Sequence, residues 1–159
     1  MALLSFFQWC SNWQAVVIVR ESKYGMPAVQ SVHLIGLTVF LATILLLNLR
    51  LARLGMLHVP LADLSQNLKP WMRGALSLSI LSGIFIFMAT PGKYLGSNPF
   101  RLKMLLLVIA VLFHFSILRR FVRSKPGSHS PRANLVVACL SVTSWFCVGW
   151  AGRAIAFIP

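Results

Sequence analysis

Four ionisable residues of this 159-residue chain lie inside or near long apolar segments, and their types could do chemistry: His33, Lys103, His114 and Arg153. An ionisable side chain left without a partner in hydrocarbon is costly, so each of the four is a candidate functional residue. A neutral imidazole inside a helix bundle commonly binds haem iron or another metal ion. We therefore take His33 and His114 as candidate metal and cofactor ligands.

Two histidines on neighbouring helices would suit the axial ligation of haem b or another tetrapyrrole. At roughly 1.5 Å per residue, however, His33 lies about 9 Å and His114 about 22 Å from the same side of the membrane. Axial ligands of one haem lie at similar depths, so this difference of about 13 Å counts against a shared haem, although helix tilt would recover part of it. A cofactor held by one histidine is a second possibility. We favour a third, in which both histidines form hydrogen bonds within the bundle.

The two cations also have alternative interpretations. Arg153 lies near the end of the last apolar segment, where it could bind the C-terminal carboxylate, a lipid phosphate or a haem propionate. Lys103 could bind a propionate as well. Either side chain could instead extend along its helix to the lipid headgroups.

The chain contains no recognisable set of catalytic residues. Its two acids, Glu21 and Asp63, both lie outside the apolar segments. This excludes paired carboxylates and argues against a proton or cation pump. His58 and His129 are expected in loops, and the sequence carries no motif for nucleophilic catalysis, phosphate binding or dinucleotide binding. We predict no catalytic residues and, at most, an electron-transfer role.

The composition indicates a membrane protein. The chain is 58% hydrophobic and 11% charged, with a mean hydropathy of +0.80. A soluble domain carries about a quarter charged residues. The net charge of +13 comes from bases that lie between apolar runs, where they suit anionic lipid headgroups rather than nucleic acid. Cys10, Cys139 and Cys147 form no CxxC pair and are expected to be free thiols.

The elements that must position these residues are helices. Aromatic and neutral polar residues alternate over residues 2–19, which predicts an amphipathic helix in the membrane interface. Within the second span Ala75, Ser79 and Gly83 recur every four residues, a pattern that lets helices approach closely. We predict an all-α integral membrane four-helix bundle forming a single transmembrane domain over residues 1–159. The predicted spans are residues 28–51, 71–90, 100–122 and 134–157.

Four spans place both termini on one side of the membrane, and the bases then indicate which side. The side with the first and third connections carries Arg50, Arg53, Lys69, Arg73, Arg119, Arg120, Arg123, Lys125 and Arg132. The side with the termini carries Arg20, Lys23, Lys93, Arg101, Lys103 and Arg153. Because bases are enriched on the cytoplasmic side, we expect a multi-pass protein of a bacterial inner membrane with both termini periplasmic.

Short motifs occur along nearly the whole chain: Arg20-Glu-Ser-Lys-Tyr-Gly-Met-Pro27, His33-Leu-Ile-Gly36, Asn48-Leu-Arg50, Pro91-Gly-Lys-Tyr94, Asn98-Pro-Phe100 with Lys103, and Gly152-Arg-Ala-Ile-Ala-Phe157. Their order resembles an uncharacterised family of small four-helix bacterial inner-membrane proteins. The layout is similar, at the level of fold only, to four-helix b-type cytochromes and copper-resistance membrane proteins.

The resemblance implies that His33, Arg50, Lys103 and Arg153 form a shared polar set. It also implies three departures, because the family pattern often has a glutamate at Gln30, an aspartate at Asn48 and an asparagine at His114. This chain would then lack two acids of the pattern, which makes an inherited proton or metal role less expected.

Two functions follow as expectations. The first is a non-catalytic accessory or anchor subunit of a larger membrane complex, in electron transfer or photosynthesis, with lipids (anionic lipids included) and other membrane subunits as partners. The second is a haem b electron-transfer subunit with His33 and His114 as axial ligands and Arg153 or Lys103 on the propionates.

Overall fold

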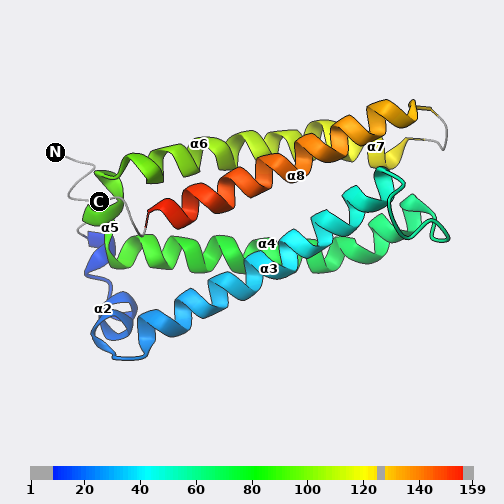
Figure 1. The fold of residues 1–159 in the computed structure, drawn as a ribbon. Helices are drawn as coiled ribbons and strands as arrows, with labels where there is room; N and C mark the ends of the chain where they lie inside the picture. Colours follow the sequence, from blue (N-terminus) through cyan, green and yellow to red (C-terminus); the bar gives the residue numbers. More distant parts are fainter. Residues whose placement is uncertain (1–8, 125–127, 156–159) are drawn as a thin grey trace. The chain divides into compact units, whose positions relative to one another are not determined.

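The computed structural model describes residues 9–124 and 128–155, and this part of the chain is helical without any strand (Figure 1). The all-α prediction is therefore confirmed. The elements are α2 (Gln14–Glu21), α3 (Gly25–Leu51), α4 (Leu61–Ala89), α5 (Pro91–Leu95), α6 (Asn98–Phe113), the π-helical turn η1 (His114–Leu118), α7 (Arg119–Arg123) and α8 (Pro131–Ala154).

Four helical stretches of the described chain are long and apolar enough to cross a membrane, as predicted. They are α3, α4, the continuous stretch Asn98–Arg123 formed by α6, η1 and α7, and α8. Proline residues and a capping side chain determine where two of these helices, α6 and α8, begin. Pro99 lies in the first turn of α6, where its missing N–H is not needed. Pro131 opens α8 behind Ser130, whose Oγ accepts a hydrogen bond from the Ala133 N–H at 3.2 Å.

The second span begins earlier than expected. Helix α4 starts at Leu61 rather than near Trp71, and Pro70 lies inside it. Asp63 stands in the first turn of α4, where a carboxylate is favourable next to the positive end of the helix dipole. Leu64 is buried and anchors the same turn. At the other end of the chain α8 ends at Ala154, and residues 156–157 of the predicted last span lie outside the described residues.

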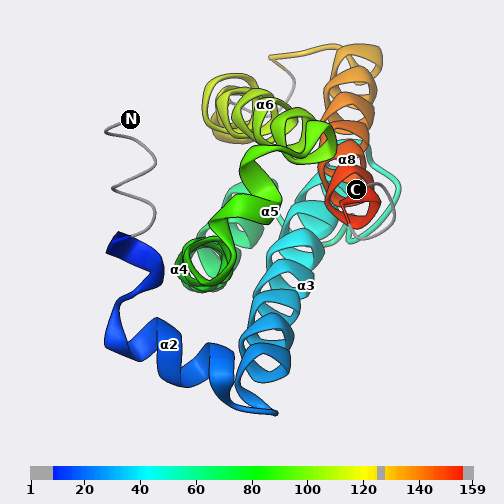
Figure 2. The same ribbon diagram turned by 90° about the vertical axis from the view of Figure 1, so that its left-hand side faces the viewer.

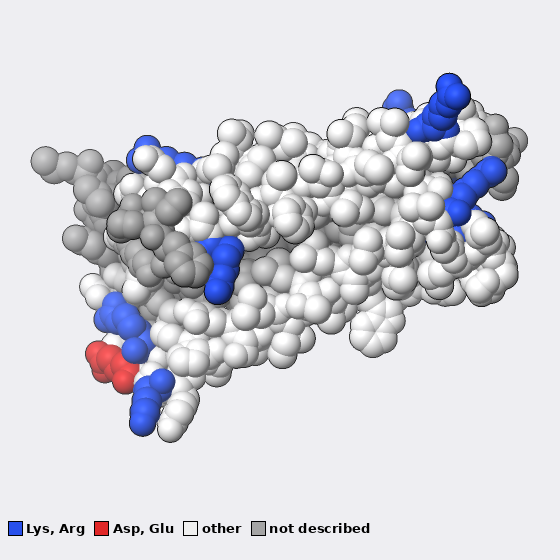
Figure 3. Space-filling model, viewed as in Figure 1, with Lys and Arg blue, Asp and Glu red and all other residues white. Residues whose placement is uncertain are grey.

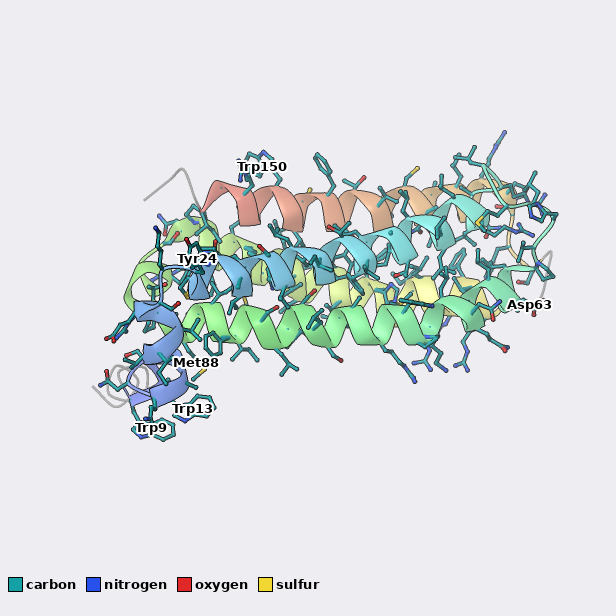
Figure 4. The ribbon with its side chains drawn as sticks, turned by 90° about the horizontal axis from the view of Figure 1, so that it is seen from below. Trp9, Trp13, Tyr24, Asp63, Met88 and Trp150 are labelled. Atoms are coloured by element: carbon teal, nitrogen blue, oxygen red, sulfur yellow. The ribbon has the colours of Figure 1, made fainter. Side chains whose placement is uncertain are left out.

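The described N-terminal segment is helical but interrupted. A turn of helix covers residues 9–11, and α2 follows after a break at Asn12 and Trp13, whereas one helix was expected over residues 2–19. Residues 2–8 of that prediction lie outside the described part. Val16 of α2 is fully buried, whereas Trp9 and Trp13 are exposed and point away from the ribbon in Figure 4. Exposed tryptophan side chains suit the membrane interface, so this segment is compatible with the predicted interfacial position.

The chain divides into two compact units, and α3 and α4 each contribute to both. The first unit comprises residues 1–40 and 73–96, and the second comprises residues 41–72 and 97–159. In the first unit the early part of α3 packs against the later part of α4. A Cβ placed on Gly36 would lie 2.6 Å from Ser79 Oγ and 3.2 Å from the Ala75 carbonyl oxygen. The predicted small-residue face of α4 is thus where α3 makes its close approach.

In the second unit α6 runs alongside α8 in the opposite direction (Figures 1 and 2). A buried cluster lies between the C-terminal end of α3, η1, α7 and the start of α8, with Leu61 of α4 and Phe113 packed against it. Lipid is as apolar as these side chains, so close packing rather than the hydrophobic effect stabilises such contacts in a membrane. We call this group the second-unit cluster, and its buried members are Leu51, Leu118, Val122, Val137 and Ala138.

Candidate functional site

His33 lies in the early part of α3 and contacts α4 through a hydrogen bond. Its Nδ1 is 3.0 Å from Ser82 Oγ. The Ser82 hydroxyl is 2.6 Å from the Leu78 carbonyl oxygen, which is the natural acceptor for its single hydrogen. Ser82 Oγ must then accept from Nδ1–H of His33. This arrangement places a proton on Nδ1.

Gly83 provides the space for the imidazole ring. A Cβ placed on Gly83 would lie 3.1 Å from His33 Cε1 and 3.6 Å from Nδ1. Ser82 and Gly83 are adjacent in α4, so one residue supplies the hydrogen-bond acceptor and the next leaves room for the ring. Together they fix both the rotation and the depth of the half-buried histidine.

The hydrogen bond to Ser82 has two interpretations. Histidines that bind a metal ion or haem iron commonly donate from one ring nitrogen to an oxygen, as His33 does from Nδ1. The same bond also serves as a structural link between two helices. Among the described residues there is no group of three or more His, Cys, Asp or Glu side chains that could hold a metal ion by themselves.

His114 lies in the second unit, as the first residue of the π-helical turn η1. The residue is 8% exposed, and Nδ1 has no hydrogen-bond partner within residues 9–124 and 128–155. Its backbone N–H is shared between the carbonyl oxygens of Ala110 and Val111. His33 belongs to the first unit, so each histidine is placed within its own unit. Ligation of one haem by both histidines stays a prediction.

Lys103 and the end of α8 come together in the second unit. The half-buried Lys103 side chain passes over Gly152: its Cε and Nζ would lie 3.4 Å and 3.5 Å from a Cβ on that glycine. Arg153 follows directly and is exposed, as is Arg101 of α6. The acid of this unit, Asp63, lies in the first turn of α4, two residues after Leu61. Leu61 packs against the second-unit cluster, which includes the early part of α8. Asp63 is therefore near the start of α8, whereas Lys103 contacts its end. The Lys103 end of the α6–α8 pair therefore suits an anion.

Arg50 has a structural contact at the end of α3. Its Nε donates a hydrogen bond to the Val59 carbonyl oxygen at 2.6 Å and so closes the connection between α3 and α4. Two residues of this connection, Arg53 and Met56, have positive φ angles of 60° and 54°. The Arg50 side chain therefore stabilises the tight turn that follows α3, and this structural role accounts for the residue without a ligand.

A buried pair that the sequence reasoning did not single out is Asn48 with Ser141. Asn48 Nδ2 donates to Ser141 Oγ at 3.0 Å and to the Ile44 carbonyl oxygen at 2.8 Å. Asn48 is 2% exposed and Ser141 is 0% exposed. The available signal was the amide itself, because a buried amide in an apolar span needs a hydrogen-bond partner.

Comparison with known proteins identifies a family but no function. The model of a family of unknown function, DUF6644, matches residues 6–158. No curated protein matches the sequence, and no solved structure does either. The chain belongs to the family DUF6644.

Proposed function

We propose that this member of the DUF6644 family is a non-enzymatic accessory or anchor subunit of a larger membrane complex. The supporting observation is an exposed face of α8 that combines small and aromatic residues. Thr143, Phe146, Gly149 and Trp150 lie on this side, and Phe146 and Trp150 are 74% and 64% exposed. A Cβ on Gly149 would meet nothing within 4 Å.

The face of α4 that contains Ala75 and Ser79 and the face of α8 that contains Gly149 differ in what covers them. Gly36 of α3 packs against Ala75 and Ser79, whereas the surface around Gly149 is exposed. Small residues at helix surfaces permit close helix contacts in membranes. We therefore assign the open face of α8, defined by Thr143, Phe146, Gly149 and Trp150, to a transmembrane helix of another subunit.

Affinity purification in a mild detergent tests this assignment. Partner chains should co-purify with the wild-type protein and should be lost from Gly149→Leu, because a leucine side chain would hold the partner helix away. Gly74→Leu is the matched control, since a Cβ on Gly74 of α4 also meets open space. A wild-type protein that always purifies alone, or equal partner recovery with both variants, would contradict the proposal.

A second candidate is a haem b electron-transfer subunit. It is supported by the hydrogen bond between His33 Nδ1 and Ser82 Oγ, because histidines that bind metals commonly donate their other ring N–H to an oxygen. His33 and, in the second unit, His114 would be the axial ligands. Arg153 or Lys103 would bind the propionates. Haem supplies the electron-transfer chemistry when bound, and the residues of this chain would orient it.

A reduced-minus-oxidised absorption spectrum of the purified protein distinguishes the two candidates. Haem b would give Soret and alpha bands that are lost in His33→Ala and kept in His58→Ala, whose histidine lies in the connection between α3 and α4. A colourless wild-type preparation, or unchanged bands in His33→Ala, would exclude His33 as a ligand.

The proposed location is a bacterial inner membrane, with both termini periplasmic and anionic lipids at the cytoplasmic face. On the face shown in Figure 3, lysine and arginine side chains gather toward the two ends. In α3 and α8 the basic residues lie in the first or last turns, whereas α4 also carries Lys69 and Arg73 further inside the helix. Charges near helix ends suit contact with headgroups on both sides of a bilayer.

A further inference from the structure

Three buried polar side chains of the second unit lie at one level of its helices. They are Asn48 in α3, His114 in η1 and Ser141 in α8, and all three are more than nine-tenths buried. Each stands about one helical turn from a member of the second-unit cluster: Asn48 from Leu51, His114 from Leu118, and Ser141 from Ala138.

The directions of the helices bring these three residues to the same side of the cluster. Helix α3 and the α6–α7 stretch run toward it, whereas α8 begins there and runs away. One turn before Leu51 and Leu118 is therefore the same level as one turn after Ala138. The bond between Asn48 and Ser141 places two members at that level directly, and η1 contacts α8. We call Asn48, His114 and Ser141 the polar layer.

Two atoms of the polar layer lack a hydrogen-bond partner in the described part of the chain: Asn48 Oδ1 and His114 Nδ1. The orientation of the Asn48 amide is fixed, because its NH₂ group donates to the Ile44 carbonyl oxygen and to Ser141 Oγ. Oδ1 is then an acceptor without a donor among residues 9–124 and 128–155. Buried polar atoms are rarely left in this state, and ordered water is the usual partner where protein is not.

The backbone at His114 departs from the α-helix at this level. The Arg119 N–H bonds to the His114 carbonyl oxygen, which is the five-residue spacing of a π-turn. Single π-turns inside α-helices occur frequently at functional sites. This turn carries the buried histidine of the unit at its first position, so the irregular backbone and the unpartnered ring atom coincide.

We propose that the polar layer binds a water molecule that joins Asn48 Oδ1 to His114 Nδ1. Water both donates and accepts hydrogen bonds, so it can donate to the amide oxygen and bond to the imidazole nitrogen in either tautomer. The three side chains are an amide, a hydroxyl and an imidazole, and the described residues hold no group of three or more metal-ligating side chains. The layer therefore suits a small neutral ligand rather than a metal ion.

An experimental structure of the full-length protein in lipid, at a resolution that shows ordered water, tests the site directly. The expected result is density for one water within about 3.2 Å of both Asn48 Oδ1 and His114 Nδ1. A layer without water, a water that reaches only one of the two atoms, a protein group bonded to either atom, or a larger ligand in the layer would overturn the proposal.

A double-mutant cycle gives a second readout. Asn48→Leu and His114→Leu each remove one side of the bridge, so the unfolding temperature of the double variant should fall by less than the sum of the single losses. Asn48→Leu combined with Ser82→Ala in the first unit is the control pair and should be additive. Additive losses for Asn48 and His114 would overturn the bridge. If a variant does not fold, the wild-type structure still decides.

Discussion

At the scale of single residues, hydroxyl groups of the spans have two uses that the sequence does not distinguish. Ser82 and Ser141 bind side chains on other helices, His33 and Asn48. Ser31, Thr38 and Ser144 bind only carbonyl oxygens of their own helix. A bond within one helix survives when helices separate, whereas a bond between helices does not. Only the bonds between helices, those of Ser82 and Ser141, should therefore matter for assembly of the bundle.

Ser82→Ala should destabilise the first unit. The substitution removes the acceptor of the His33 Nδ1–H, and an inter-helix hydrogen bond in a membrane is worth about 1 kcal/mol. Equilibrium unfolding in mixed micelles measures this loss, and the imidazole ¹⁵N shifts of His33 should change with it. Ser31→Ala removes a hydroxyl that bonds only to Pro27 of its own helix, and it should leave both readouts unchanged. Equal effects of the two variants would contradict the role of Ser82.

Ser141→Ala should destabilise the second unit by a similar amount, about 1 kcal/mol. It leaves one N–H of the Asn48 amide without its acceptor in a buried place. Ser144→Ala is the matched control in the same helix, since the Ser144 hydroxyl bonds to the Ser141 carbonyl oxygen. The same unfolding measurement applies, and a loss confined to Ser144→Ala would show that the inter-helix bond has no weight.

The sequence identified polar residues within apolar segments but not which residues they contact. His33 and His114 were identified from their place in apolar segments alone. Their neighbours depend on how far each helix rotates about its axis, and side chains of the partner helix set that rotation. Ser82 and Gly83 therefore could not be matched to His33 beforehand. The amide of Asn48 gave a signal of the same kind, yet its partner Ser141 lies 93 positions away in the sequence.

At the scale of elements, the long apolar runs predicted the four spans because length and hydropathy suffice for a helix that crosses a membrane. Helix α4 begins before the predicted span, because Leu61–Pro70 is polar enough to resemble a loop although it forms turns of the same helix. The π-turn at His114 was beyond sequence reasoning, since one extra residue in a turn leaves no compositional trace.

Gly36→Ala should weaken the contact between the early part of α3 and the later part of α4. The added Cβ would lie 2.6 Å from Ser79 Oγ, and overpacking of this kind costs about 1–3 kcal/mol. Ser79→Ala removes that oxygen, so the double variant Gly36→Ala with Ser79→Ala should recover part of the loss. The readout is the midpoint of unfolding in mixed micelles.

Gly149→Ala is the control for this element. Its Cβ meets open space, so the change should be neutral or slightly stabilising, because alanine favours a helix over glycine by about 1 kcal/mol. If Gly36→Ala is as stable as Gly149→Ala, the close approach of α3 and α4 at Gly36 is not needed for the fold.

At the scale of the whole molecule, exposed Trp and Tyr residues lie near the start of α3 and the end of α8. Trp9, Trp13 and Tyr24 are exposed near the start of the described chain, and Trp150 is exposed one turn before the end of α8 (Figure 4). Trp and Tyr at such positions anchor helices at headgroup level. They indicate the boundaries of the bilayer but not which side is cytoplasmic, because aromatic residues occur at both interfaces. The orientation depends on the cations alone.

Cysteine labelling in cells tests that orientation. In a background without native cysteines, Tyr24→Cys and Leu57→Cys place a thiol before α3 and in the connection after it, at positions that are 73% and 62% exposed. An excess of bases on the side of the first and third connections predicts that this side is cytoplasmic. A membrane-impermeant maleimide should therefore label Tyr24→Cys in intact spheroplasts and Leu57→Cys only after permeabilisation. The reverse pattern would invert the topology, and it would move Lys103 and Arg153 to the cytoplasmic face, where they would meet anionic lipid instead of the periplasmic leaflet.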